Sequence, residues 1–189
     1  MSGVWGGVWD AWGGVLVAWL PAVPLSAAGV WGLTRLRVRQ GMCRRTALRF
    51  SAAEVGVLCG TVPWVWMILT PRAGADGVSA VPFRDLLDTL RGSPSAAIVQ
   101  VGANLVLFVP LGFFLPLRGA AFAGVVRMTL LGAVLSASLE AVQYVCALGR
   151  VASVDDVLLN AAGAGVGAFL ARLWLARDEE RHARTARAC

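Results

Sequence analysis

Histidine, cysteine and charged residues are scarce in this chain, and lysine is absent. Charged residues make up 15% of its 189 positions, against about a quarter in soluble domains. His182 is its single histidine, and its four cysteines include no CxxC pair. One histidine and four cysteines without a CxxC pair are too few ligands for a usual zinc site, and their spacing does not indicate a disulfide framework. We therefore expect neither metal nor cofactor. The first basic residue is Arg35, and since a cleavable signal peptide starts with basic residues, we expect none here.

The positive charge comes entirely from arginine. The net charge is +6 and the pI is about 10.4, values that could indicate a partner nucleic acid. However, the arginines lie in short segments that flank long apolar runs. This placement is typical of membrane topology signals and not of a nucleic-acid-binding face.

Long apolar runs dominate the sequence. Hydrophobic residues account for 58% of it, and the mean hydropathy is +0.70. A helix needs about 20 mostly apolar residues to cross the roughly 30 Å hydrocarbon layer of a bilayer. Five stretches meet this need, and they lie near residues 11–33, 51–70, 98–117, 126–148 and 157–176. We therefore predict an all-α, polytopic transmembrane helix bundle of about five spans.

The arginines also predict an orientation. Residues 34–50 carry six arginines and no acid, which places this loop in the cytoplasm under the positive-inside rule. Threading the five spans from there gives an N-out, C-in topology. Thirteen arginines then lie inside, and four lie outside, namely Arg72, Arg84, Arg91 and Arg150.

This topology divides the chain into four parts. Residues 1–70 form two helices joined by the basic cytoplasmic loop, 71–97 an outer segment, 98–176 a three-helix region, and 177–189 a basic cytoplasmic tail. In the outer segment, apolar residues recur at helical spacing after Pro82, which predicts a short amphipathic helix. The tryptophans Trp5, Trp9 and Trp12 lie around the start of the first span and indicate an aromatic belt at the outer interface, with a ligand platform as the alternative.

The polar residues that point to a function lie within the apolar spans of the second half of the chain. Helical spacing places Gln100 beside Asn104, and Glu140 beside Gln143. A carboxylate within a span costs on the order of 3 kcal/mol, so Glu140 should face the bundle and have a partner, for which Arg150 and Asn160 are candidates. The candidate ligand-binding residues, which all fall on the outer side, are Asn104, Glu140, Gln143, Arg150, Asp155, Asp156 and Asn160.

A purely structural role is the alternative for these residues. Polar side chains between membrane helices can serve only as packing contacts, and Asp155 or Asp156 could cap the last span. Two other features are interpreted structurally. Gly163 and Gly167 form a small-residue pair that we expect to pack against the fourth span of the same chain, with dimerisation as the alternative. Glu54, near the cytoplasmic end of the second span, is expected to reach water or pair with Arg49.

The polar residues follow a pattern that resembles the VanZ-like family of bacterial inner-membrane proteins. The matching segments are Pro82-Phe83, Asn104, Phe108-Val109-Pro110-Leu111-Gly112, Glu140-Ala141-Val142-Gln143, Arg150, Asp155-Asp156 and Asn160-Ala161-Ala162-Gly163. The resemblance covers about residues 80–170. One departure is Ser153, because the family often carries an acidic residue at this position.

The resemblance implies a multi-pass protein of the cell membrane, associated with teicoplanin resistance. The first hypothesis is an accessory or binding role at the outer leaflet, in cell-envelope biology or glycopeptide resistance. The partners would be membrane lipid and either a lipid-linked cell-wall precursor or a glycopeptide. The second is an intramembrane enzyme acting on a lipid-linked or phosphate-containing substrate, with Glu140 or Asp156 as general base, although no catalytic motif is recognisable. A transporter fits least, because no internal repeat is visible.

Overall fold

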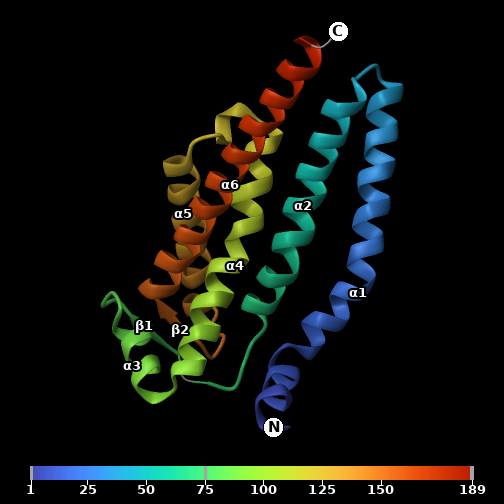
Figure 1. Ribbon diagram of the computed structural model, residues 1–189. Helices are drawn as coiled ribbons and strands as arrows, with labels where there is room; N and C mark the ends of the chain where they lie inside the picture. The colour runs from blue at the N-terminus through green and yellow to red at the C-terminus, as the bar shows by residue number, and fades with distance from the viewer. Residues whose placement is uncertain (1, 75, 188–189) are drawn as a thin grey trace.

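The protein is a bundle of long helices capped at one end by short elements (Figure 1). The computed structural model describes residues 2–74 and 76–187, with side chains at Val17, 20–74 and 76–182. The long helices are α1 (Ser2–Arg39), α2 (Arg44–Leu69), α4 (Pro94–Arg118), α5 (Val125–Val145) and α6 (Val154–Arg187). The short elements are β1 (Gly77–Ser79), α3 (Arg84–Gly92), η1 (Ala120–Phe122) and β2 (Val151–Ser153).

The prediction of an all-α polytopic bundle is confirmed. In the described part of the chain, four helices are long and apolar enough to cross a membrane: Arg44–Leu69, Pro94–Arg118, Val125–Val145 and Val154–His182. The first predicted span, 11–33, lies within α1, and its residues 11–16, 18 and 19 fall outside the described side chains. Trp5, Trp9 and Trp12 also lie there, so the aromatic belt stays a prediction. The N-out, C-in orientation likewise stays a prediction.

The core is formed where α6 packs against both α4 and α5. Small residues allow this close approach. A Cβ atom added at Gly163 would lie 2.2 Å from the Leu105 carbonyl oxygen, and one at Gly167 would lie 2.3 Å from that of Val109. Both carbonyls belong to α4, which is the third predicted span. We expected this pair to face the fourth predicted span, which is α5, and that expectation was wrong. The contact with α5 uses other small residues, because a Cβ at Gly132 would lie 2.6 Å from the Cβ of Ala164.

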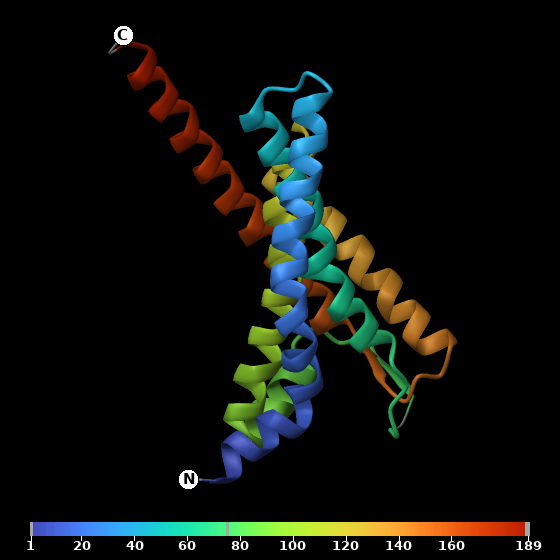
Figure 2. The same cartoon turned by 90° about the vertical axis from the view of Figure 1, so that its right-hand side faces the viewer.

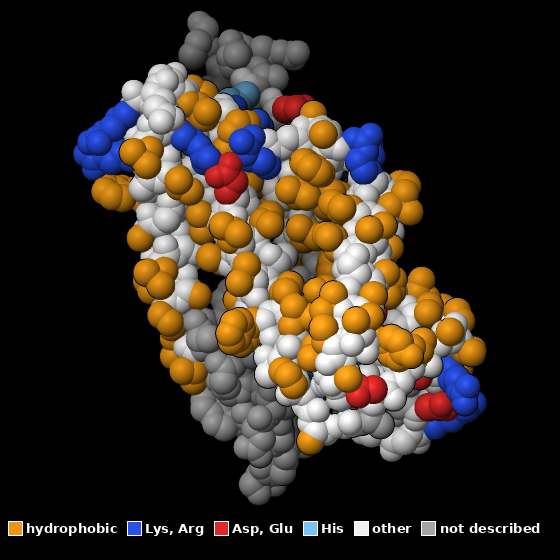
Figure 3. Space-filling view, turned by 180° about the vertical axis from the view of Figure 1, so that it is seen from behind, with side chains coloured by type: hydrophobic (Ala, Val, Ile, Leu, Met, Phe, Trp, Pro, Cys, Tyr) orange, Lys and Arg blue, Asp and Glu red, His pale blue; other side chains and the backbone are white. Residues whose placement is uncertain are grey.

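Arginines gather at the end of the bundle that holds the α1–α2 loop. Figure 3 shows them above a broad apolar band. There Glu54 accepts hydrogen bonds from Arg37 at 2.6 Å and from Arg118 at 2.7 Å. This acid therefore ties α2 to α1 and α4. Of our two alternatives for it, the pair with Arg49 was wrong, whereas the side chain does reach water, because it is 33% exposed. The tail after residue 176 continues α6 as a helix, which Figure 2 shows projecting from the bundle, and Asp178 pairs with Arg45.

Three of the short elements, β1, α3 and β2, form a cap at the opposite end, whereas η1 joins α4 to α5 at the arginine-rich end (Figure 1). The predicted amphipathic helix exists as α3. The sequence did not predict the parallel pairing of β1 with β2, in which Val78 lies opposite Ala152. The turn before β2 depends on Gly149, whose φ is +67° and where an added Cβ would lie 1.9 Å from the Arg72 carbonyl oxygen. A glycine is needed here both for its conformation and for its lack of a side chain.

Candidate functional site

A polar pocket lies between the helices, next to the cap. Its volume is 320 Å³, at the lower end of the range for small-molecule sites. It is bordered by the end of α2, by α4, α5 and α6, and by the segments that follow α2 and α5. Its lining residues are Trp64, Met67, Ile68, Arg72, Gln100, Ala103, Asn104, Leu107, Ser136, Leu139, Glu140, Gln143, Arg150, Asp156 and Asn160.

Two carboxylates enter this pocket from neighbouring helices. Asp156, in the first turn of α6, accepts a hydrogen bond from the side-chain amide of Asn104, and Gln100 one turn earlier on α4 reaches the same carboxylate. Glu140 on α5 accepts a hydrogen bond of 3.1 Å from the backbone N–H of Ser153. These contacts leave further lone pairs on both acids, because an ionised carboxylate can accept about four hydrogen bonds.

Arg150 brings a positive charge to the same pocket. It lies in the loop after α5, and its Nη2 donates a 3.0 Å hydrogen bond to the carbonyl oxygen of Met67. That carbonyl is in the last turn of α2, where backbone acceptors lack helical partners and cations are favoured. Partial burial and nearby Arg72 lower the pKa of the Arg150 guanidinium, while Glu140 and Asp156 raise it. The group stays protonated, as arginine does in proteins.

The charged groups of the pocket do not pair directly with one another in the described part of the chain. Among the described residues, no direct ion pair joins Arg72 or Arg150 to Glu140 or Asp156. The pocket therefore holds two positive and two negative groups of nearly balanced charge in a half-buried place. Such groups need polar partners there, which can come from water or from the polar part of a ligand.

Two carboxamides complete the lining. Gln143 donates a 3.0 Å hydrogen bond to the carbonyl of Ile68, which also lies in the last turn of α2. Asn160 donates to the hydroxyl of Ser136 at 2.8 Å. In the described part of the chain, three buried side-chain atoms lack a hydrogen-bond partner, and two of them, Arg150 Nε and Asn160 Oδ1, belong to residues of this pocket. Unsatisfied buried polar atoms are rare and call for an explanation, such as a ligand or a bound water.

The structure brings together six of the seven candidate residues. Asn104, Glu140, Gln143, Arg150, Asp156 and Asn160 all line the pocket, and Gln100 joins them.

Asp155 is the exception. Its side chain is buried, with the residue 3% exposed, and it accepts hydrogen bonds from the backbone N–H groups of Phe83 and Leu86. It therefore caps the N-terminus of α3, a different helix from the one considered in the sequence. Asp156, the other candidate for a cap, points instead to α4.

Two charged or hydroxyl-bearing residues of the pocket were not identified as site residues from the sequence. Arg72 follows α2 directly, where an arginine indicates topology and nothing more. Ser136 could have been found, because it lies four residues before Glu140 and seven before Gln143, on the same face of α5.

Comparison with known proteins identifies the family of this chain. A family model described as VanZ/LLP1 matches residues 57–175. The chain belongs to the VanZ-like family. No curated protein and no solved structure matched it. Every residue that lines the polar pocket lies within the matched region, so the pocket is part of the VanZ-like portion of the protein.

The chain departs from the VanZ-like sequence pattern at Ser153, and the structure shows what this residue contacts. Ser153, where the family often has an acid, donates a 2.6 Å hydrogen bond from its hydroxyl to Asp85 and one from its backbone to Glu140. A carboxylate at this position would face two others. The serine thus allows Asp85 and Glu140 to approach the same strand, and Ser79 on β1 adds a 2.7 Å hydrogen bond to Asp85.

Proposed function

We propose that this VanZ-like membrane protein binds the polar head of an envelope amphiphile in the pocket between α2, α4, α5 and α6. The observation that carries the proposal is the set of four charged groups there, Arg72, Arg150, Glu140 and Asp156, between which the described part of the chain shows no direct ion pair. Arginine can bind a phosphate or carboxylate through two parallel hydrogen bonds. The acids and the amides would accept hydroxyl or amide hydrogens from the same ligand.

The volume of the pocket limits what it can enclose. A volume of 320 Å³ corresponds to about ten water molecules at about 30 Å³ each. This suits a phosphate with part of a sugar, but not a whole lipid-linked precursor or a whole glycopeptide. The pocket would therefore hold one part of such a molecule, and its acyl or polyprenyl tail would remain in the bilayer.

The cellular setting follows from the predicted topology and the family resemblance. With N-out, C-in orientation in a bacterial cell membrane, the cap and the pocket would lie at the outer leaflet, where lipid-linked cell-wall precursors are found. Glycopeptides of the teicoplanin type also act there and carry an acyl tail. A role in envelope biology or in teicoplanin resistance is the function that this placement supports.

One observation favours an enzymatic alternative. Glu140 and Asp156 enter the pocket from two different helices, and a pair of carboxylates can act as general acid and general base. Arg72 and Arg150 would then stabilise negative charge that develops on a phosphate-containing substrate.

Binding and turnover measured on the same protein separate these functions. The protein in nanodiscs would be titrated with a fluorescent lipid-linked precursor, a polyprenyl phosphate and teicoplanin, and each mixture would be examined for products. We expect saturable binding of at least one of these and no product. Product formation that disappears in Glu140→Gln or Asp156→Asn while binding persists would instead establish the enzyme. Absence of binding to all three ligands would contradict the proposal.

A further inference from the structure

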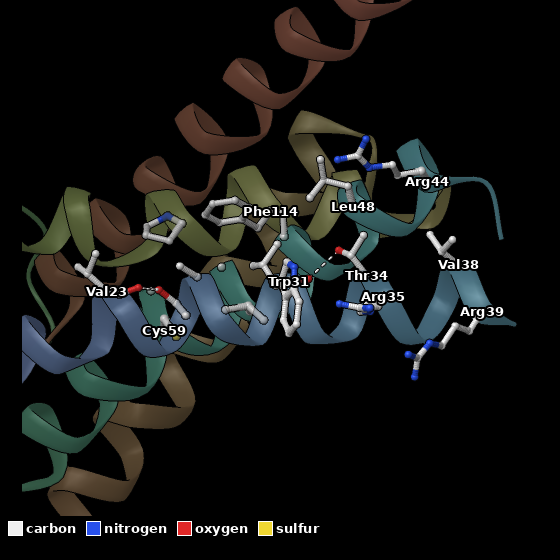
Figure 4. Close-up of a pocket in the computed structure, with 18 residues that line it drawn as sticks. Val23, Trp31, Thr34, Arg35, Val38, Arg39, Arg44, Leu48, Cys59 and Phe114 are labelled. Atoms are coloured by element: carbon white, nitrogen blue, oxygen red, sulfur yellow. Dashed lines mark hydrogen bonds between the residues drawn. The ribbon is translucent and has the colours of Figure 1, made fainter.

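A second, larger cavity lies at the other end of the bundle. It is a groove of 1000 Å³ between α1 and α4, with α2 as its floor (Figure 4). It shares no lining residue with the polar pocket. The groove exists because α1 packs chiefly against α2 and not against α4. The side of α4 that faces α1 is therefore left uncovered.

Small residues make the groove concave. Ala27 on α1 and Ala52, Gly56 and Gly60 on α2 line it, and Phe114 of α4 closes one side. The groove extends along α1 from Val23 to Val38, which is about 22 Å at 1.5 Å per residue. One leaflet of the hydrocarbon layer is about 15 Å deep. The groove is therefore long enough to hold an acyl chain from the interface through the depth of one leaflet.

Charge is confined to one end of this groove. Arg35, Arg39 and Arg44 line it next to the α1–α2 loop, and none of its described lining residues is acidic. Figure 4 shows Arg39 and Arg44 at this end, with Val23 at the opposite, apolar end.

These three arginines differ from their neighbours. Arg37 pairs with Glu54, and Arg45 pairs with Asp178. Within the described residues, by contrast, Arg35, Arg39 and Arg44 form no ion pair with a carboxylate, and Arg35 instead lies over the Trp31 ring at 5.2 Å. Three uncompensated guanidinium groups at the mouth of an apolar groove complement an anionic head attached to an acyl tail.

We propose that this groove is a binding site for an anionic phospholipid from the leaflet next to the α1–α2 loop. The phosphate would lie at the end of the groove that Arg35, Arg39 and Arg44 line, and one acyl chain would follow α2 past Ala52 and Gly56 towards Gly60. The bound lipid fills the space between α1 and α4 and so fixes α1 against the rest of the bundle. This role is independent of the ligand in the polar pocket.

Lipid retention measured by native mass spectrometry tests the proposal. The wild-type protein would be released from nanodiscs of equal parts phosphatidylglycerol and phosphatidylcholine. We expect one phosphatidylglycerol per chain, retained at least tenfold over phosphatidylcholine. The double variant Arg39→Ala/Arg44→Ala should lose this preference. The matched control Arg172→Ala/Arg177→Ala removes two exposed arginines of α6 that do not line the groove, and it should retain the lipid.

A second variant separates shape from charge. Ala27→Trp fills the groove and leaves all the arginines in place, so it should also release the lipid. Thermal midpoints in pure phosphatidylcholine would confirm that each variant is folded. Equal retention of both lipids, equal loss in both double variants, or retention by Ala27→Trp would overturn the proposal. So would a dimer whose interface buries the groove, because a second copy would then be the occupant.

Discussion

We predict that the carboxylate of Asp155 stabilises α3 and does not bind the ligand. It is buried and accepts two backbone hydrogen bonds at the start of α3, including one of 3.0 Å from Leu86. Hydrogen bonds to a charged group contribute about 1.5–3 kcal/mol each. Asp155→Asn keeps the shape but removes the charge, and it places an N–H donor against a backbone donor. We therefore expect α3 to lose about 3 kcal/mol of local stability.

Hydrogen exchange is the suitable assay, because α3 is peripheral and can open without global unfolding. A loss of about 3 kcal/mol corresponds to roughly 100-fold faster exchange, at 1.4 kcal/mol per factor of ten. Residues 84–92 should show this change, while α4 and α6 should not. Asp88→Asn is the control, since Asp88 is exposed on the same helix and forms only surface pairs with Arg84 and Arg91, which contribute little. If Asp155→Asn left exchange in α3 unchanged but abolished ligand binding, Asp155 would be a ligand residue and our account of it would be wrong.

Further predictions concern packing and topology. Gly163→Leu should reduce accumulation of the folded protein, because its Cβ would meet the Leu105 carbonyl at 2.2 Å, whereas Gly32→Leu should be tolerated because that glycine has open space around it. If both variants accumulate and melt alike, the close α4–α6 contact is refuted. Cysteine labelling should mark Val151→Cys in intact cells. It should mark the native Cys43 only after permeabilisation. Labelling of Cys43 from outside would reverse the orientation and place the polar pocket at the cytoplasmic face.

The helices and most of the pocket could be predicted from the sequence for simple physical reasons. An apolar run long enough to cross a bilayer has few alternatives to a helix, because its backbone groups must be satisfied within the segment. Polar residues within such runs are driven to face one another. The short connection between α5 and α6 then brings Glu140, Arg150 and Asp156 to the same end of the bundle.

The features that the sequence did not predict depend on directions and partners in three dimensions. Asp155 and Asp156 are adjacent and identical, but successive side chains of a helix point about 100° apart, so one caps α3 and the other enters the pocket. The spacing of Gly163 and Gly167 indicates a close helix contact without showing which helix makes it. The β1–β2 pair has three residues in each strand, too few for an alternating pattern to be recognised.

The central claim is that Arg150 and its neighbours in the polar pocket bind an anionic, hydrogen-bonding head group. Arg150→Lys tests it most directly, because lysine keeps the charge but cannot form the planar two-point contact. The matched control is Arg84→Lys, on the exposed surface of α3. Dissociation constants would be measured in nanodiscs for the ligand that binds the wild type. The account predicts at least tenfold weaker binding for Arg150→Lys and no change for Arg84→Lys. Equal affinities for both variants and the wild type would contradict it and would reduce the pocket to a set of helix-packing contacts.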